Sequence, residues 1–229
     1  RIAANARAVI ERARAEADLR PYMVTLTQRN CDNNELGERI TDILSAWRSI
    51  MHDIKGQRRY IAGYAKTVEI TVGKDGRYHP HLHAIILVPP DIPKEMLRAR
   101  YWARHWQVYM RTQRYQGQIV PICDIRPIRA NRRKGITDSA AAAAEVAKYM
   151  SKSGEILSHE GAYERIITID GATSGRKLRT YGGVWKRIRA EMKLEDGMAT
   201  EPPTQYLADM AIEIWQFAGM EKREYTRIV

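Results

Sequence analysis

The sequence predicts an α+β fold built on an antiparallel sheet. Two β-branched, apolar segments at 63–72 and 78–88 flank a glycine-containing turn at 73–76, which indicates a β-hairpin. Apolar residues recur at helical spacing from 36 to 54, and the five consecutive alanines at 140–144 favour another helix. A length of 229 residues is sufficient for one domain with a buried core.

The other elements follow from propensity and from helix-breaking residues. A helix rich in Ala, Arg and Glu is expected at 5–19, because Pro21 disfavours helix in the residue before it, and a strand is expected at 22–27. Trp102 and Trp106 lie one helical turn apart and are expected in the core. Further predicted elements are a helix at 93–109, a strand at 118–128, a helix at 140–152, a strand at 164–169 and a helix at 205–219.

Charge and cysteine content limit the classes of function. The chain has 38 Lys and Arg residues against 27 Asp and Glu, a net charge of +11, which favours a polyanionic partner and nucleic acid first. Cys31 and Cys123 are far apart and form no Cys-x-x-Cys pair, which argues against a disulfide framework or zinc finger and fits the cytoplasm. Because no apolar run reaches the length of a membrane span and the start lacks a signal-peptide core, no membrane partner is expected.

Histidines are concentrated on the second strand of the predicted hairpin. His79, His81 and His83 are half of the six histidines in the chain. Alternate side chains of a strand point to one face, so His81 and His83 present two imidazoles together while Leu82, Ala84, Ile86 and Val88 face a core. Two nitrogen ligands fixed in this way are a common beginning of a metal site. The alternative is that they are polar residues on the open face of a sheet.

The alanine-rich helix carries a second group of reactive side chains. Glu145, Tyr149 and Lys152 stand at i, i+4 and i+7, which places all three on one helix face. A tyrosine hydroxyl with a pKa of about 10 needs a polarised electrophile or a nearby cation to react readily. Lys152 and a histidine-bound cation would supply both, and the combination describes metal-assisted phosphoryl transfer to tyrosine on single-stranded DNA. The alternative is a surface tyrosine between two solvated charges.

Three motifs in order resemble those of the rolling-circle replication initiators of the HUH endonuclease superfamily. They are Val-Thr-Leu-Thr at 24–27, His-Pro-His-Leu-His at 79–83 and Lys-Tyr-Met-Ser-Lys at 148–152. The chain resembles in particular the plasmid replication proteins with one catalytic tyrosine, from about residue 22 to residue 185. Tyr149 follows the histidines, whereas the tyrosine of conjugative relaxases precedes them, which favours a replication initiator or a related transposase.

The resemblance implies a fold, a reaction and a set of partners. The expected sheet has the histidine strand at its centre, helices packed mainly on one face, and the other face open to DNA. The implied activity is nicking and joining of single-stranded DNA at a replication origin, with Tyr149 forming a 5′-phosphotyrosine link and leaving a free 3′-hydroxyl. Glu145 is implied to activate water at termination. A host helicase is an expected partner, because helicase motifs are absent from the sequence. A host polymerase is expected to extend the free 3′-hydroxyl.

The third metal ligand depends on the register of the hairpin. If 74–76 is a three-residue turn with Gly76 left-handed, Glu69 lies opposite His81 and completes the site. A two-residue turn at 75–76 would instead set Glu69 against Leu82, on the other face. His79 is the competing ligand. Imidazole and carboxylate together suit Mg²⁺ or Mn²⁺, with Mn²⁺ better matched to imidazole, and zinc is a further option.

Basic residues on both sides of the tyrosine helix, with Lys148 inside it, are the expected phosphate contacts. Each alone is typical of a solvated surface charge, and only the clustering of these residues indicates DNA. They are Arg126, Arg129, Arg132, Arg133, Lys134, Lys148, Arg176, Lys177, Arg179, Lys186 and Arg187. Tyr181 or Trp185 would stack an unpaired base, although core packing is the simpler interpretation for Trp185.

The expected organisation is an N-terminal helix at 1–20, an HUH-type nicking domain at 21–195 and a C-terminal helical extension at 196–229. Two alternatives belong to other classes of function. One is a noncatalytic nucleic-acid binding module of the same fold. The other is a nuclease that uses metal-activated water and needs no tyrosine. Within the favoured class, a single-tyrosine transposase is the nearest alternative.

Overall fold

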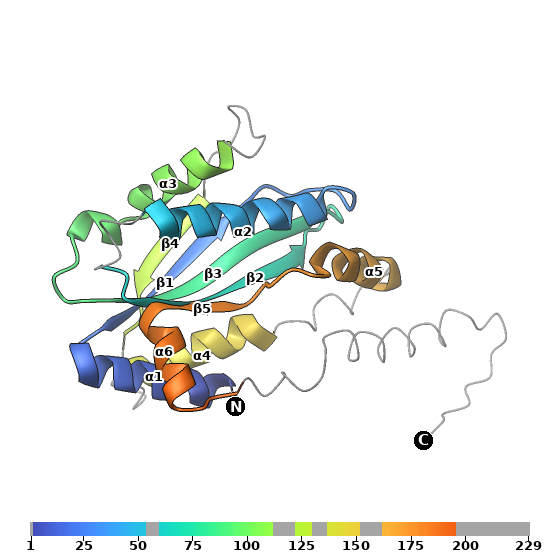
Figure 1. The fold of residues 1–229 in the computed structure, drawn as a ribbon. Helices are drawn as coiled ribbons and strands as arrows, with labels where there is room; N and C mark the ends of the chain where they lie inside the picture. Colours follow the sequence, from blue (N-terminus) through green and yellow to red (C-terminus); the bar gives the residue numbers. More distant parts are fainter. Residues whose placement is uncertain (1, 54–59, 112–121, 130–136, 152–161, 196–229) are drawn as a thin grey trace, which may run out of the picture.

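A computed structural model describes residues 2–53, 60–111, 122–129, 137–151 and 162–195 (Figure 1). In this part of the chain, antiparallel strands form one five-stranded sheet with the order β4-β1-β3-β2-β5. The strands are β1 (Arg20–Thr27), β2 (Gly63–Val72), β3 (Tyr78–Val88), β4 (Ile122–Pro127) and β5 (Thr180–Gly182). The histidine strand β3 is central, as predicted.

Within the described residues, six helices pack around this sheet. They are α1 (Ile2–Ala17), α2 (Leu36–Asp53), α3 (Ala99–Arg111), α4 (Asp138–Ser151), α5 (Ala162–Thr173) and α6 (Gly183–Glu191), with a short 3₁₀ helix at Lys94–Leu97. Strands and helices of this arrangement confirm the predicted α+β class. None of the described helices is long and apolar enough to cross a membrane.

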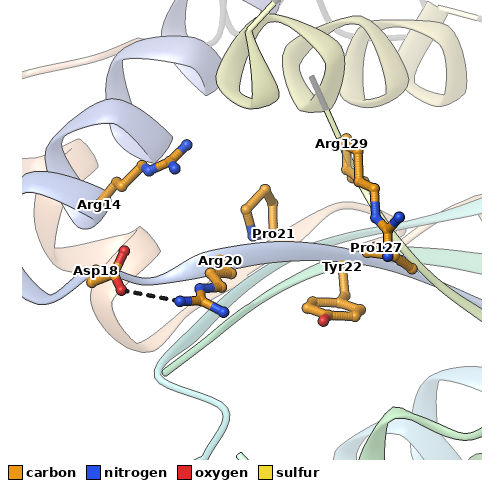
Figure 2. A pocket seen from close by; sticks show the side chains of 8 residues that line it. Arg14, Asp18, Arg20, Pro21, Tyr22, Pro127 and Arg129 are labelled. Atoms are coloured by element: carbon orange, nitrogen blue, oxygen red, sulfur yellow. Dashed lines mark hydrogen bonds and ion pairs between the residues drawn. The ribbon is translucent and has the colours of Figure 1, made fainter. Parts of the chain in front are cut away.

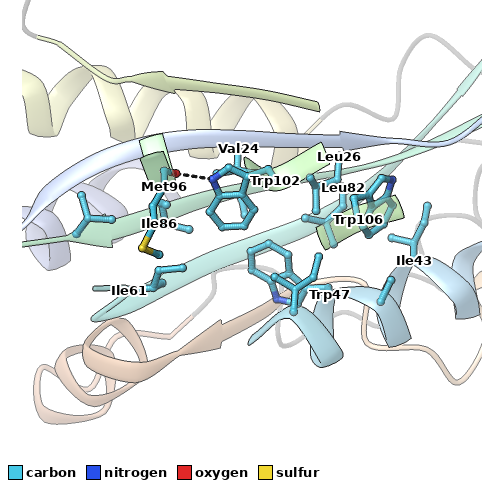
Figure 3. Packing of buried hydrophobic residues seen from close by; sticks show 14 of the residues in the cluster. Val24, Leu26, Ile43, Trp47, Ile61, Leu82, Ile86, Met96, Trp102 and Trp106 are labelled. Carbon is cyan, nitrogen blue, oxygen red and sulfur yellow. Dashed lines mark hydrogen bonds between the residues drawn. The ribbon is translucent and has the colours of Figure 1, made fainter. Parts of the chain in front are cut away.

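The larger core lies between the sheet and the helices α2 and α3. Even-numbered strand residues, among them Leu82 and Ile86, face Trp47, Trp102 and Trp106 (Figure 3). Each of the three indole rings is at most 2% exposed. The alternation predicted for the histidine strand is therefore confirmed, because Leu82, Ala84, Ile86 and Val88 all belong to this core.

The other face of the sheet is also covered over part of its length. Met23, Ala65, Ile85 and Leu87 pack with residues of α1, α4 and α6, below the sheet in Figure 1. Helices therefore lie on both faces, and the expectation that they pack mainly on one face was wrong. The physical reason is that β3 is apolar on both faces from residue 84 to residue 88, and such a strand is stable only when both faces are covered.

Two segments near the end of the described chain differ from prediction. Residues 164–169, expected as a strand, belong to α5, because Ile169 and Ala172 pack in a cluster with Leu36 and Ile40 of α2. Tertiary packing here overrides the β propensity of the isoleucines. The helix α6 was not predicted. It buries Trp185 and Ile188 in the second core, which is the apolar cluster between the sheet and the helices α1, α4 and α6. The predicted helix at 205–219 and the whole of 196–229 lie outside the described residues.

Candidate metal centre

The turn of the β2–β3 hairpin determines which residues meet on the sheet. The amide of Gly73 donates to the carbonyl of Arg77 at 2.8 Å, and Gly76 has φ of +76°. This is the three-residue turn with a left-handed glycine, one of the two turns that the sequence left open. As a result Glu69 pairs with His81.

Glu69, His81 and His83 form a compact group on the sheet face that α1, α4 and α6 partly cover. The Nε2 atoms of His81 and His83 lie 3.0 Å and 2.8 Å from Oε2 of Glu69. Nitrogen and oxygen atoms from the three side chains all lie within 4.8 Å of one another. Two of the three residues, Glu69 and His83, are only 7% exposed.

Hydrogen bonding keeps the carboxyl group ionised. Burial raises the pKa of Glu69, but hydrogen bonds from His81 and His83 lower it by more, so this pKa lies well below its ordinary value. Burial, followed by the proximity of His81, lowers the pKa of His79. At neutral pH the group therefore offers one anionic oxygen and neighbouring imidazole nitrogens.

The donor set fits a divalent cation. Neighbouring ligands of an octahedral ion with bonds of about 2.1 Å are separated by about 3 Å, close to the distances found here. Two imidazoles and one carboxylate suit Mn²⁺. Mg²⁺ prefers oxygen ligands to imidazole, and Zn²⁺ would take the same three residues in a tetrahedral geometry. The ring of His79 contacts His81 edge-on, with 5.1 Å between ring centroids. His79 does not belong to the compact group of Glu69, His81 and His83.

Glu145 approaches this centre from α4. Glu145 and Val146 of α4 and Thr67 and His83 of the sheet line one small cavity of about 10 Å³. That volume is near the minimum that one water molecule needs. Oε2 of Glu145 is buried and lies 3.8 Å from Nη2 of Arg126 on β4. A carboxylate, a histidine of the metal group and an arginine therefore converge where α4 crosses the sheet.

Tyr149 lies in the same helix, one turn beyond Glu145. Residues four positions apart share a helix face, so Tyr149 and Glu145 occupy backbone positions on the same face of α4. The side chains of Lys148 and Tyr149 lie outside what the structure describes, as does the whole of Lys152.

The predicted phosphate contacts have different environments. Arg126 and Arg129 are exposed on β4 and just after it, and Lys177 is exposed as well. Arg176 donates to the Thr41 hydroxyl at 3.0 Å and to the Ala172 carbonyl at 2.9 Å, so it ties the segment after α5 to α2. Partly or largely exposed side chains are also found at Arg179, Lys186 and Arg187, while Arg132, Arg133 and Lys134 lie outside the described residues.

Two aromatic residues considered for base stacking belong to the second core. Trp185 is 1% exposed, and Tyr181 stacks on it with 6.5 Å between ring centroids. The guanidinium of Arg189 covers the ring of Tyr181 at 4.2 Å. Core packing, the simpler interpretation for Trp185, is confirmed.

Sequence reasoning missed Lys66. This lysine is 3% exposed, and its Nζ donates to the carbonyls of Lys177 and Leu178 at 3.2 and 3.1 Å. Lys66 thereby holds the basic segment at 176–179 against β2. The amide of Val68 on β2 also donates to the Leu178 carbonyl. The available signal was a lysine between Tyr64 and Val68, among the alternate residues of this strand that turn toward the core.

Comparison with known proteins gives the family. The model of the Replication protein family matches residues 1–223. The chain belongs to this family. The match confirms the resemblance to replication proteins that the three motifs indicated. No solved structure matches this replication protein at the significance that its curated relatives reach.

Curated relatives carry corresponding names. Protein rep of Lentilactobacillus hilgardii is 31% identical over 178 residues, covering 76% of this chain and 55% of the relative. Protein rep of Lactiplantibacillus plantarum is 29% identical over 195 residues, covering 82% and 60%. Replication protein of Staphylococcus aureus is 26% identical, covering 82% and 80%. This replication protein thus spans a little over half the length of the first two relatives.

Proposed function

We propose that this replication protein initiates rolling-circle replication of a plasmid by nicking and rejoining single-stranded DNA at the origin. Its family and the names of its relatives support a role in replication. The net charge of +11 supports binding to DNA. The observation that carries the nicking reaction is the compact Glu69, His81 and His83 group beside the helix that contains Tyr149.

In the proposed mechanism Glu69, His81 and His83 would hold one Mn²⁺ or Mg²⁺ ion. When bound there, the cation would withdraw electron density from the scissile phosphate and stabilise the negative charge of the transition state. Placing the ligands on adjacent, hydrogen-bonded strands fixes them before any ion binds. His79 takes no direct part in this mechanism.

Tyr149 acts as the nucleophile. Its phenolic oxygen attacks the phosphorus atom in line, a bond forms between this oxygen and phosphorus, and the bond from phosphorus to the 3′-oxygen breaks. The phenolic proton is transferred in net terms to the departing 3′-oxygen. The products are a 5′-phosphotyrosine link and a free 3′-hydroxyl, which a host polymerase can extend. Lys152, expected on the same helix face, would favour the ionised phenol.

Glu145 acts later, as the base that activates water when replication ends. Its carboxylate and His83 line the same water-sized cavity, which supports this role. Phosphate contacts are proposed for the basic residues that precede and follow α4, and for Lys148 within this helix by its sequence position.

Three further proposals concern organisation and setting. The nicking domain would occupy residues 21–195, with an N-terminal helix at 1–20 that packs on α4 and α6 and a C-terminal extension at 196–229. The protein would act in the cytoplasm on the single-stranded origin, with a host helicase separating the strands ahead of the polymerase.

Covalent capture tests this function. Wild type, Tyr149→Phe and the control Tyr163→Phe on α5 are incubated with Mn²⁺ and single-stranded DNA of randomised sequence, then denatured. DNA-linked protein is expected with wild type and the control and not with Tyr149→Phe. Sequencing the captured DNA identifies the target, and a transposon end in place of a plasmid origin would favour the related transposase. Cleavage without an adduct would instead assign hydrolysis by activated water, and binding without cleavage a noncatalytic module.

A further inference from the structure

A basic pocket, separate from the metal group, lies at the opposite end of β1 from that group. It is a pocket of about 340 Å³ where the chain leaves α1, enters β1 and later emerges from β4. Its lining residues are Arg14, Asp18, Arg20, Pro21, Tyr22, Pro127, Ile128 and Arg129 (Figure 2). Backbone pairing closes one side, because the amide of Ile128 donates to the carbonyl of Pro21 at 3.1 Å.

Positive charge dominates this pocket. Three arginines from separate segments, Arg14, Arg20 and Arg129, surround Pro21 (Figure 2), and all three are exposed. The acidic residue in the lining, Asp18, lies 3.4 Å from the guanidinium of Arg20. Carbonyl groups at the C-terminal end of α1 add partial negative charge, and Arg14 in the last turn offsets it. The site as a whole therefore attracts an anion.

The shape and the remaining lining indicate what kind of anion fits. A volume of about 340 Å³ is at the lower end of the range for small-molecule sites and is too large for a simple ion alone. Pro127 is exposed and offers a flat apolar surface beside the guanidinium groups, while Tyr22, which lines the pocket too, is half-buried and also packs against the larger core. Guanidinium groups bind phosphate oxygens in pairs, and flat side chains accept a nucleobase or sugar.

We propose that this pocket binds one phosphodiester, with its attached nucleoside, of the single-stranded DNA on which the protein acts. This inference rests on the proposed function. From Tyr22 to Thr27, the partner of His81, β1 covers about 17 Å at about 3.3 Å per residue. The pocket would therefore hold the DNA several nucleotides away from the cleaved bond and contribute affinity without taking part in the chemistry.

The test compares two triple variants that change charge equally. The pocket variant carries Arg14→Gln, Arg20→Gln and Arg129→Gln. The control carries Arg98→Gln, Arg100→Gln and Arg104→Gln, three exposed arginines in and just before α3. Binding to fluorescently labelled single-stranded DNA of randomised sequence is measured in EDTA, so that cleavage does not intervene, over a range of salt concentrations. Thermal unfolding of each variant checks that the fold is retained.

Relative to the control, the pocket variant should bind roughly 10-fold to 100-fold more weakly. Its slope of log affinity against log salt should be smaller by about 0.7, the contribution of one phosphate on a single strand. Arginine-to-lysine substitutions at the same three positions should restore part of the affinity. Equal losses in the pocket variant and the control would overturn the proposal.

Two other outcomes are separable. If wild type itself does not bind single-stranded DNA, the proposed function fails and the pocket proposal is overturned with it. A second titration uses a free nucleoside monophosphate. Binding of this nucleotide that is lost in the pocket variant, with DNA affinity equal to that of the control, would assign the pocket to a free nucleotide and overturn the DNA proposal.

Discussion

Oγ1 of Thr25 lies 3.2 Å from Nδ1 of His83, across the pairing of β1 with β3. The opposite ring nitrogen of His83 faces Glu69. If Nε2 is to bind a cation, Nδ1 must carry the proton, and the threonine hydroxyl is placed to accept it. Thr25 would thus fix both the tautomer and the ring orientation of a candidate ligand.

Replacing Thr25 with valine should weaken Mn²⁺ binding by roughly 10-fold to 100-fold, because the imidazole loses its outer hydrogen-bond partner. Isothermal titration calorimetry with Mn²⁺ measures this loss. Thr25→Ser should retain most of the affinity. The matched control is Thr27→Val, since Thr27 pairs with His81 and the structure shows no hydrogen bond between the two side chains. An equal effect of both valine variants would contradict the positioning role.

Glu145→Gln should separate the two halves of the proposed reaction. The tyrosine step is expected to continue, while hydrolysis of the phosphotyrosine link should slow by roughly 10²-fold to 10⁴-fold because the general base is lost. A time course of adduct formation and release on denaturing gels measures both steps. Glu164→Gln on the exposed side of α5 serves as the control. Loss of adduct formation itself would mean that Glu145 acts in the first step.

Gly76→Ala should destabilise the protein by about 1–2 kcal/mol, the cost of a left-handed conformation for a residue with a Cβ atom. An added Cβ would meet nothing within 4 Å, so the effect is conformational and not steric. Gly171→Ala is the matched control: its Cβ would also meet nothing within 4 Å, but inside α5 it should stabilise by about 0.5–1 kcal/mol. Urea unfolding measures both, and equal signs would refute the assignment.

Lys66 should make stability depend on pH above neutrality. Burial, with a smaller effect of Arg48, lowers the pKa of Lys66 from 10.5 to about 8. Between these values the folded state binds fewer protons than the unfolded state, so the Lys66 contribution to stability increases as pH rises from about 8 to 10.5, by about 3 kcal/mol.

The measurement is the difference in unfolding free energy between wild type and Lys66→Met at each pH. Taking the difference removes the opposite trend from Cys31 and Cys123, because burial raises their thiol pKa values to about 11 and about 12. The wild type should gain stability relative to the variant over this window. A difference that does not change with pH would show that the lysine titrates normally.

The sequence contained enough information to predict the centre of the sheet and the two histidine ligands, whereas the position of Glu69 depended on which of two turns the hairpin adopts. Alternation on β3 separates Leu82 from His83, and a left-handed Gly76 determines the position of Glu69. The positions of α5 and α6 depend instead on contacts between residues far apart in the chain. Ala172 meets Leu36, and Trp185 meets the apolar end of β3. Such contacts leave no periodic signal in the local sequence.

The position of β3 between β1 and β2 has a consequence for ion exchange. All three candidate ligands stand on the paired central strands, which in a sheet of this kind are among the last segments to open. The relative positions of the three ligands are established when the chain folds, so an ion can enter or leave without any refolding. The apoprotein should therefore remain folded in a chelator, with a metal-free centre ready to be reloaded.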